Sequence, residues 1–334
     1  MATITNITIR FSNIGAAYDS NRPDYSNTYQ ITSKAVDGVP MVRLSDLETY
    51  MGATQVSATG TTWVLNRNGQ YILFNENSVG ATSSTSYSVY NPYTGGHENR
   101  TISLSITLPI AAQKINTYKY VPLYAIAMQL GALKVYTNSS TEYTVFDFRV
   151  NGNNGPLTDT NTYVVGGPWV TNWSSLGSTN LSNHFKINEF WDKSSTAGAK
   201  QLKVCVALIA VAERIRYYYN NDSALNLGSA FRTYEYNKSL SGSWDRSFHM
   251  RGRAFDVTSA NNGTALYNSL YNEFCGGSAQ PTHTGAALPN GFWRNNDFDN
   301  CYSKGWEIET MPRGTSTWLH VQVKPGVEDA NYCP

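Results

Sequence analysis

The sequence predicts an α+β protein of two domains: an N-terminal repeat of small strand–helix–strand units and a C-terminal α+β domain with an antiparallel sheet. Three observations predict this class. An internal repeat lies in the first 150 residues, a cluster of Asn, Gly and Pro follows at 151–156, and apolar periodicity resumes from Phe185. The 334 residues also favour about two domains. The expected division is 1–150, a linker at 151–182 and a second domain at 183–334.

The internal repeat aligns 42–56 with 121–135 at a constant offset of 79 residues. Apolar residues in each copy fall three and four apart, which predicts one face of a short helix. Gly52 and Gly131 follow where a left-handed residue would end that helix. The stretches 56–65 and 135–146 are rich in Val, Tyr, Thr and Trp, which is typical of strands.

These paired units resemble the copper amine oxidase N-terminal-like domain, a small α+β module. The resemblance implies a binding or spacer unit attached to a cell-surface enzyme. It implies no copper site here, because His97 stands alone in its loop and a solvated histidine is the better interpretation.

The second half begins with an apolar stripe that predicts its main helix, with 220–222 as the expected end. The residues of the stripe are Leu202, Cys205, Val206, Ile209, Ala212 and Ile215. A further helix is expected at 264–274, and strands are expected at 306–310 and 318–323. Cys205 is expected to be a buried thiol, whereas Cys275, Cys301 and Cys333 could form one bridge in an oxidising compartment.

Composition excludes several classes of function. The net charge of +1 gives no field that would attract a nucleic acid. The longest apolar run, 204–212, is too short for a membrane span, which needs about twenty residues. Charged residues are only 15%, which favours a protein outside the cytoplasm. Because the start shows no signal peptide, export by another route or cleavage from a precursor is expected.

Two segments carry the residues with metal chemistry, 247–257 and 318–323. His249 and Asp256 are seven residues apart, and Gly252 would let the backbone reverse between them. His320 alternates with polar neighbours on the last strand, opposite apolar residues that would enter the core. Two imidazoles and one carboxylate are a ligand set that suits Zn²⁺ and leaves a fourth position open. The spacing of His249 and Asp256 alone is weak support for a metal.

The longer string Ser-x-His-x-x-Gly-x-Ala-x-Asp at 247–256 resembles the zinc motif of the D-alanyl-D-alanine carboxypeptidase family. That family also includes vancomycin-resistance dipeptidases and phage L-alanyl-D-glutamate endolysins. Segments 185–190, 229–237 and 318–321 resemble further family segments in the same order, so the resemblance covers about 183–325. It implies that His249, Asp256 and His320 hold Zn²⁺.

The resemblance also implies roles in substrate binding. Arg232 matches the arginine that binds the substrate's carboxylate or polarised carbonyl, with a surface ion pair as the structural alternative. Ser247 is expected to shape the ligand turn or contact substrate, and Asn237 to hold the loop.

The chain departs from the family at the general base, the residue that would accept a proton from the attacking water. Relatives carry an acidic residue three positions before the last ligand, or an acidic residue or histidine two positions from it. Here those positions hold Thr317, Trp318 and Gln322. Glu307 and Glu309 could substitute if their strand lies beside the metal, although ordinary exposed carboxylates are the alternative. His283 is a more remote candidate.

Two functions of different classes therefore remain open. The first is a hydrolase, a zinc-dependent peptidase that cleaves a D-amino-acid-containing bond in the stem peptides or cross-links of bacterial peptidoglycan. The second is a catalytically degenerate protein that keeps the zinc site for a structural or wall-binding role, as the Hedgehog signalling domain does. Either would be extracellular or cell-wall associated, and a phage-derived endolysin would explain export without a signal.

Overall fold

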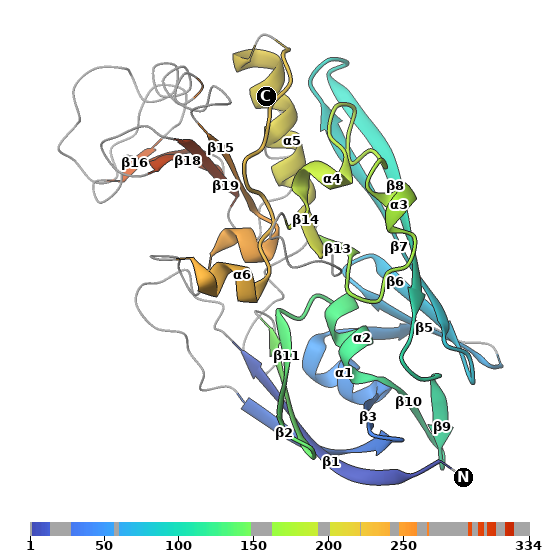
Figure 1. Ribbon diagram of the computed structural model, residues 1–334. Helices are drawn as coiled ribbons and strands as arrows, with labels where there is room; N and C mark the ends of the chain where they lie inside the picture. Colours follow the sequence, from blue (N-terminus) through green and yellow to red (C-terminus); the bar gives the residue numbers. More distant parts are fainter. Residues whose placement is uncertain are drawn as a thin grey trace.

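The computed structural model describes residues 2–13, 28–56, 60–147, 162–192, 201–220, 222–240, 247–258, 266, 293–295, 300–303, 306–311 and 318–323 (Figure 1). Strands provide most of the regular structure, and short helices lie against the sheets. The predicted α+β class is therefore confirmed. All the strand pairs are antiparallel in the described part of the chain, apart from the parallel pair of β1 (Ile4–Asn13) and β12 (Glu142–Asp147).

The first sheet has seven strands in the order β11-β12-β1-β2-β3-β10-β9. Its remaining members are β2 (Thr28–Val36), β3 (Val39–Arg43), β9 (Gln113–Ile115), β10 (Tyr118–Pro122) and β11 (Lys134–Ser139).

Helix α1 (Leu44–Met51) follows β3 and helix α2 (Leu123–Gln129) follows β10, as the aligned segments predicted. Gly52 adopts the left-handed conformation that ends α1. Strands β3 and β10 pair with each other, and their register sets Val42 opposite Val121. These are equivalent positions in the aligned copies, while the duplication itself stays a prediction.

The second sheet has the order β4-β5-β6-β7-β8. Its strands are β4 (Thr54–Val56), β5 (Thr62–Arg67), β6 (Gln70–Asn75), β7 (Gly80–Asn91) and β8 (Gly96–Thr107). Residues alternate between buried and exposed along β6 and β7, so one face of this sheet contacts the core. His97 lies exposed at the start of β8, against Tyr90.

Residues 148–161, which include the first part of the expected linker, lie outside the described residues. Beyond it, β13 (Thr162–Gly166) pairs with β14 (Leu202–Cys205), and α3 (Trp173–Leu176) and α4 (Ile187–Phe190) follow β13. Trp169 and Trp173 are partly buried and pack against the core. One continuous apolar cluster contains buried residues from both halves of the described chain.

The main helix of the second half begins later than the sequence predicted. Helix α5 spans Val206–Arg214, whereas Leu202 and Cys205, which were expected on the helix, belong to strand β14. The physical reason is pairing with β13, together with a hydrogen bond from the Cys205 N–H to the Gly252 carbonyl at 2.9 Å. A π-helical turn, Ile215–Tyr219, continues α5 to Asn220, close to the predicted end. Cys205 is a buried free thiol, as expected.

The third sheet, at the upper left of Figure 1, has the order β15-β19-β18-β17-β16. Its strands are β15 (Ala254–Thr258), β16 (Trp293–Asn295), β17 (Asn300–Ser303), β18 (Trp306–Met311) and β19 (Trp318–Val323). The two predicted strands, 306–310 and 318–323, are thereby confirmed. The helix expected at 264–274 lies outside the described residues, apart from Leu266, which is helical and buried.

Among the described helices, none combines the length and apolar character that crossing a membrane requires.

Candidate metal centre

A tight turn brings His249 and Asp256 together. Ser247 begins a single 3₁₀ turn at Phe248–Arg251, where its hydroxyl oxygen accepts a hydrogen bond from the His249 N–H. Gly252 then takes a φ of +68°, and the chain reverses into β15, which carries Asp256. A side chain at Gly252 would place its Cβ 2.2 Å from the Lys203 carbonyl oxygen. Glycine is therefore required both for the conformation and for the close approach to β14.

His320 reaches the same place from the neighbouring strand. Strands β15 and β19 are antiparallel, and their register sets Asp256 directly opposite His320. Residues paired in this way lie on the same face of a sheet. The apolar residues that alternate with His320 are fully buried, which confirms the two faces predicted from the sequence; they are Leu319, Val321 and Val323.

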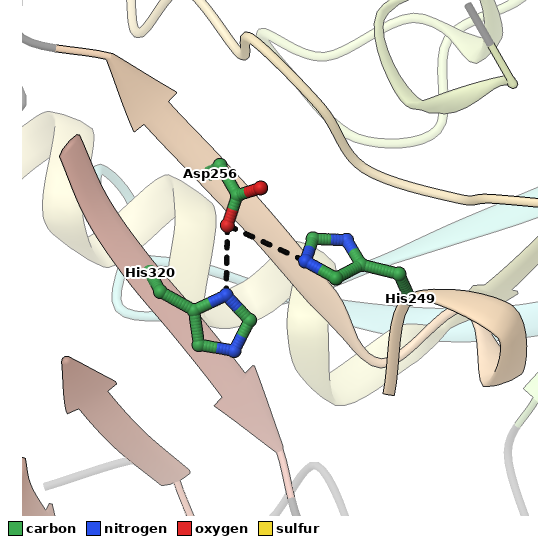
Figure 2. A group of neighbouring side chains, drawn as sticks. All are labelled: His249, Asp256 and His320. Carbon is green, nitrogen blue, oxygen red and sulfur yellow. Dashed lines mark hydrogen bonds and ion pairs between the residues drawn. The ribbon is translucent and has the colours of Figure 1, made fainter. Parts of the chain in front are cut away.

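The three side chains point toward one another (Figure 2). Their ligand atoms all lie within 4.8 Å of one another, and all three residues are buried. One carboxylate oxygen, Asp256 Oδ1, lies 3.3 Å from His249 Nε2 and 2.7 Å from His320 Nδ1. Residues distant in the sequence thus form one compact group of the size that a single ion would need.

The outer nitrogen of each imidazole faces an oxygen atom. His249 Nδ1 lies 2.6 Å from the Ala230 carbonyl oxygen, and His320 Nε2 lies 3.0 Å from Gln322 Oε1. A carbonyl oxygen only accepts, so His249 must carry its proton on Nδ1. Burial lowers the pKa of His249 despite the attraction of Asp256, which favours the neutral ring. Nε2 of His249 therefore presents a lone pair to the carboxylate.

The His249 Nε2 lone pair and the Asp256 carboxylate are thus buried acceptors that face one another. Burial alone would raise the pKa of Asp256, but the charges and hydrogen bonds of His249 and His320 lower it below its usual range. An ionised carboxylate beside the His249 lone pair is unfavourable unless a proton or a cation lies between them. The donor set and its outer hydrogen bonds fit a divalent metal such as Zn²⁺.

Arg232 contacts the second oxygen of the same carboxylate. Its Nη2 lies 2.7 Å from Asp256 Oδ2, and its Nε donates to the Ser229 hydroxyl at 3.0 Å. The isolated β-bridge between Ser229 and Asp256 fixes the backbone from which this contact is made. The Arg232 side chain is 15% exposed, so this ion pair is partly buried. Nη1 makes no hydrogen bond within the described part of the chain.

Four other predicted site residues lie on described elements. Ser247 is the N-terminal cap of the ligand turn, and Asn237 is fully buried on α6 (Tyr234–Ser239), the helix that follows Arg232. The register of β18 and β19 sets Glu309 opposite His320 and Glu307 opposite Gln322. The strand that carries the two glutamates therefore does lie beside the strand of the last histidine. His283 and Thr317 lie outside the described residues.

Sequence reasoning missed the oxygen atoms that surround the three side chains. The Ala230 carbonyl is a backbone group and leaves no signal in the sequence. Ser229 lies in segment 229–237, in which the family resemblance gave roles to Arg232 and Asn237 but not to the serine. The sequence indicated only that Gln322 cannot serve as a general base. Its position two residues after His320 on a strand nevertheless puts both side chains on one face.

Two buried imidazoles and a carboxylate, with an arginine beside them, form a donor set that can hold a metal ion. Residues 183–286 match the family model described as Peptidase M15, which supports a metallopeptidase. The matched segment contains His249 and Asp256 and ends before His320. No curated protein and no solved structure matches the chain.

Proposed function

We propose that this protein is a zinc-dependent peptidase that cleaves a D-amino-acid-containing bond in bacterial peptidoglycan, in stem peptides or in cross-links. The observation that carries the proposal is the convergence of His249, Asp256 and His320. One nitrogen of each ring lies close to Asp256 Oδ1, and the other lies beside an oxygen atom. The Peptidase M15 match over two of these three residues supports the same reaction class at the level of a metallopeptidase.

His249 Nε2, Asp256 Oδ1 and His320 Nδ1 would hold the ion. Bound there, Zn²⁺ would supply Lewis-acid polarisation of the scissile carbonyl and lower the pKa of water to about 7. The protein's part is to keep the three donor atoms close and deprotonated before the ion arrives. Burial, which lowers the pKa of His249, and the Ala230 carbonyl, which accepts the Nδ1–H of its ring, are suited to that part.

Arg232 is proposed to serve both the site and the substrate. Two of its nitrogens hold Asp256 and Ser229, while Nη1 is left for a substrate carboxylate or carbonyl oxygen. A peptidoglycan stem peptide ends in such a carboxylate, and a guanidinium is well suited to bind it. Ser247, as the cap of the ligand turn, is proposed to shape that turn, and Asn237 to support α6 behind Arg232.

Glu309 is proposed as the general base. It would take the role of the acidic residue that relatives carry at the position of Thr317. The register supports it, because position 309 lies opposite His320, whereas Glu307 pairs with position 322, one step further along the sheet face. Glu309→Gln should lower kcat by about 10²–10⁴-fold with little loss of bound zinc. Glu307→Gln is the matched control and should retain most activity. Equal activity in both variants and the wild type would exclude this assignment.

A catalytically degenerate zinc protein that binds the cell wall is the second candidate. It is favoured by the sequence itself, because Thr317, Trp318 and Gln322 stand where relatives have acidic residues or histidine. In that case the N-terminal half, as a binding or spacer unit, would provide much of the attachment. Both candidates imply a location outside the cell or at its wall.

One experiment separates the two candidates. The zinc-loaded protein is incubated with purified peptidoglycan and with soluble stem peptides and cross-linked dimers, and the products are identified by mass spectrometry. The peptidase predicts release of a D-amino acid or separation of dimers, abolished by chelation and restored by zinc. Zinc content with wall binding, but with no cleavage of any of these substrates, would support the degenerate protein and exclude the peptidase.

A further inference from the structure

The last ligand strand carries a polar residue, Gln322, two positions beyond His320. Both lie on the same face of β19, and Gln322 is half-buried. Its Oε1 lies 3.0 Å from His320 Nε2, a distance typical of a good N–H···O hydrogen bond. The contact therefore joins the outer edge of the imidazole to a neutral side chain of the same strand.

The tautomer of His320 decides whether it can bind a metal at this site. Its Nδ1 is the atom that faces Asp256 Oδ1, at 2.7 Å. If Nδ1 carried the proton, it would donate to that carboxylate and could not be a ligand. If Nε2 carries the proton, Nδ1 keeps its lone pair and joins the inward-facing donors.

We propose that Gln322 is a positioning residue that accepts the Nε2–H of His320 and so presents Nδ1 to the metal. The inference rests on the proposed zinc site and deepens it. A neutral amide oxygen performs this role without adding a second negative charge beside Asp256. His249 has the equivalent arrangement, with the Ala230 carbonyl as acceptor. Gln322 thus has a function in the site although it cannot act as a base.

The direct test is the affinity for zinc, measured by competition with a chelator. Gln322→Met removes the acceptor and keeps the length of the side chain, and it should weaken zinc binding by about 10–100-fold. Gln322→Glu retains an acceptor oxygen and should restore the affinity to within a few-fold of the wild type. Gln30→Met is the control, because Gln30 is exposed on β2 in the first sheet. It should leave the affinity unchanged.

A spectroscopic signature separates positioning from a general structural effect. In zinc-loaded protein with ¹⁵N-labelled histidine, the Nε2–H of His320 should give a resolved signal in the wild type and in Gln322→Glu. In Gln322→Met that signal should disappear through fast exchange with water. The Nδ1–H signal of His249 should persist in all three proteins, because its backbone acceptor is unchanged.

Two failures are distinguishable. A wild type that binds no zinc would overturn both the proposed function and this inference. A wild type that binds zinc with the same affinity as Gln322→Met, and with an unchanged Nε2–H signal, would overturn the inference alone.

Discussion

Replacing Arg232 with methionine tests whether the guanidinium holds Asp256 or serves only the substrate. The change removes the charge and the two hydrogen bonds but keeps a long apolar stem. Asp256 would then be left with a carboxylate oxygen, Oδ2, whose partner at 2.7 Å has gone. The Asp256 side chain is 4% exposed, so water replaces that partner poorly.

The expected loss depends on whether the metal is present. Breaking a fully buried ion pair by removing one member costs roughly 3–5 kcal/mol. Because Arg232 is partly exposed, the metal-free protein should lose about 2–3 kcal/mol of its free energy of unfolding. With zinc bound, the ion compensates the carboxylate, and the loss should fall to about 1 kcal/mol.

The assay is urea unfolding of the wild type and Arg232→Met, each with a chelator and with excess zinc. Arg10→Met is the matched control, since Arg10 forms an exposed ion pair with Glu142 at 3.5 Å and should cost less than about 1 kcal/mol in both conditions. The reasoning is refuted if Arg232→Met loses cleavage activity while its unfolding free energy matches the wild type without zinc. Arg232 would then act on the substrate alone.

Three further predictions concern the turn, the acid response and the base. Gly252→Ala should lower the free energy of unfolding by more than about 2 kcal/mol and reduce bound zinc, because the left-handed φ is combined with a collision at the Lys203 carbonyl. Gly95→Ala is the control: Gly95 has a φ of +67° in open space, so this change should lower the free energy of unfolding by only about 1–2 kcal/mol. Similar melting temperatures for the two variants would contradict this. Burial lowers the pKa of His249, so the unfolded chain binds more protons than the folded chain below about pH 6.5, and the melting temperature of metal-free protein should fall between pH 7 and 5. The melting temperature of His249→Asn should fall less steeply over that range. A fall parallel to that of the wild type would count against His249 as the titrating group. A pH profile of activity should lose its acidic limb in Glu309→Gln if Glu309 is the base, and an unchanged limb would argue for another group.

Much of the second half could be predicted from short-range patterns. Alternation along 318–323 gave the correct faces of β19, and Gly252 marked a reversal that the positive φ confirms. Both are local features, since a strand's period and a glycine's conformation depend on adjacent residues. The candidate ligands followed from those two features together with the family resemblance.

Other elements required information that no local pattern contains. Leu202 and Cys205 fit a helical stripe, yet their segment pairs with β13, because a short apolar run is ambiguous until its partner is known. The long β7–β8 hairpin was not predicted, since its outward face is rich in serine and threonine, which are equally common in loops. The contact of Arg232 with Asp256 likewise depends on a β-bridge between distant segments.

The central claim is that His249, Asp256 and His320 hold one zinc ion, and metal analysis tests it most directly. The protein is dialysed against limiting zinc, and the zinc content per chain is measured for the wild type and for His320→Phe, with His97→Phe as the control for an exposed histidine. The account predicts about one ion per chain in the wild type and the control, and a small fraction of that in His320→Phe. Equal zinc content in all three proteins, or none in the wild type, would contradict it.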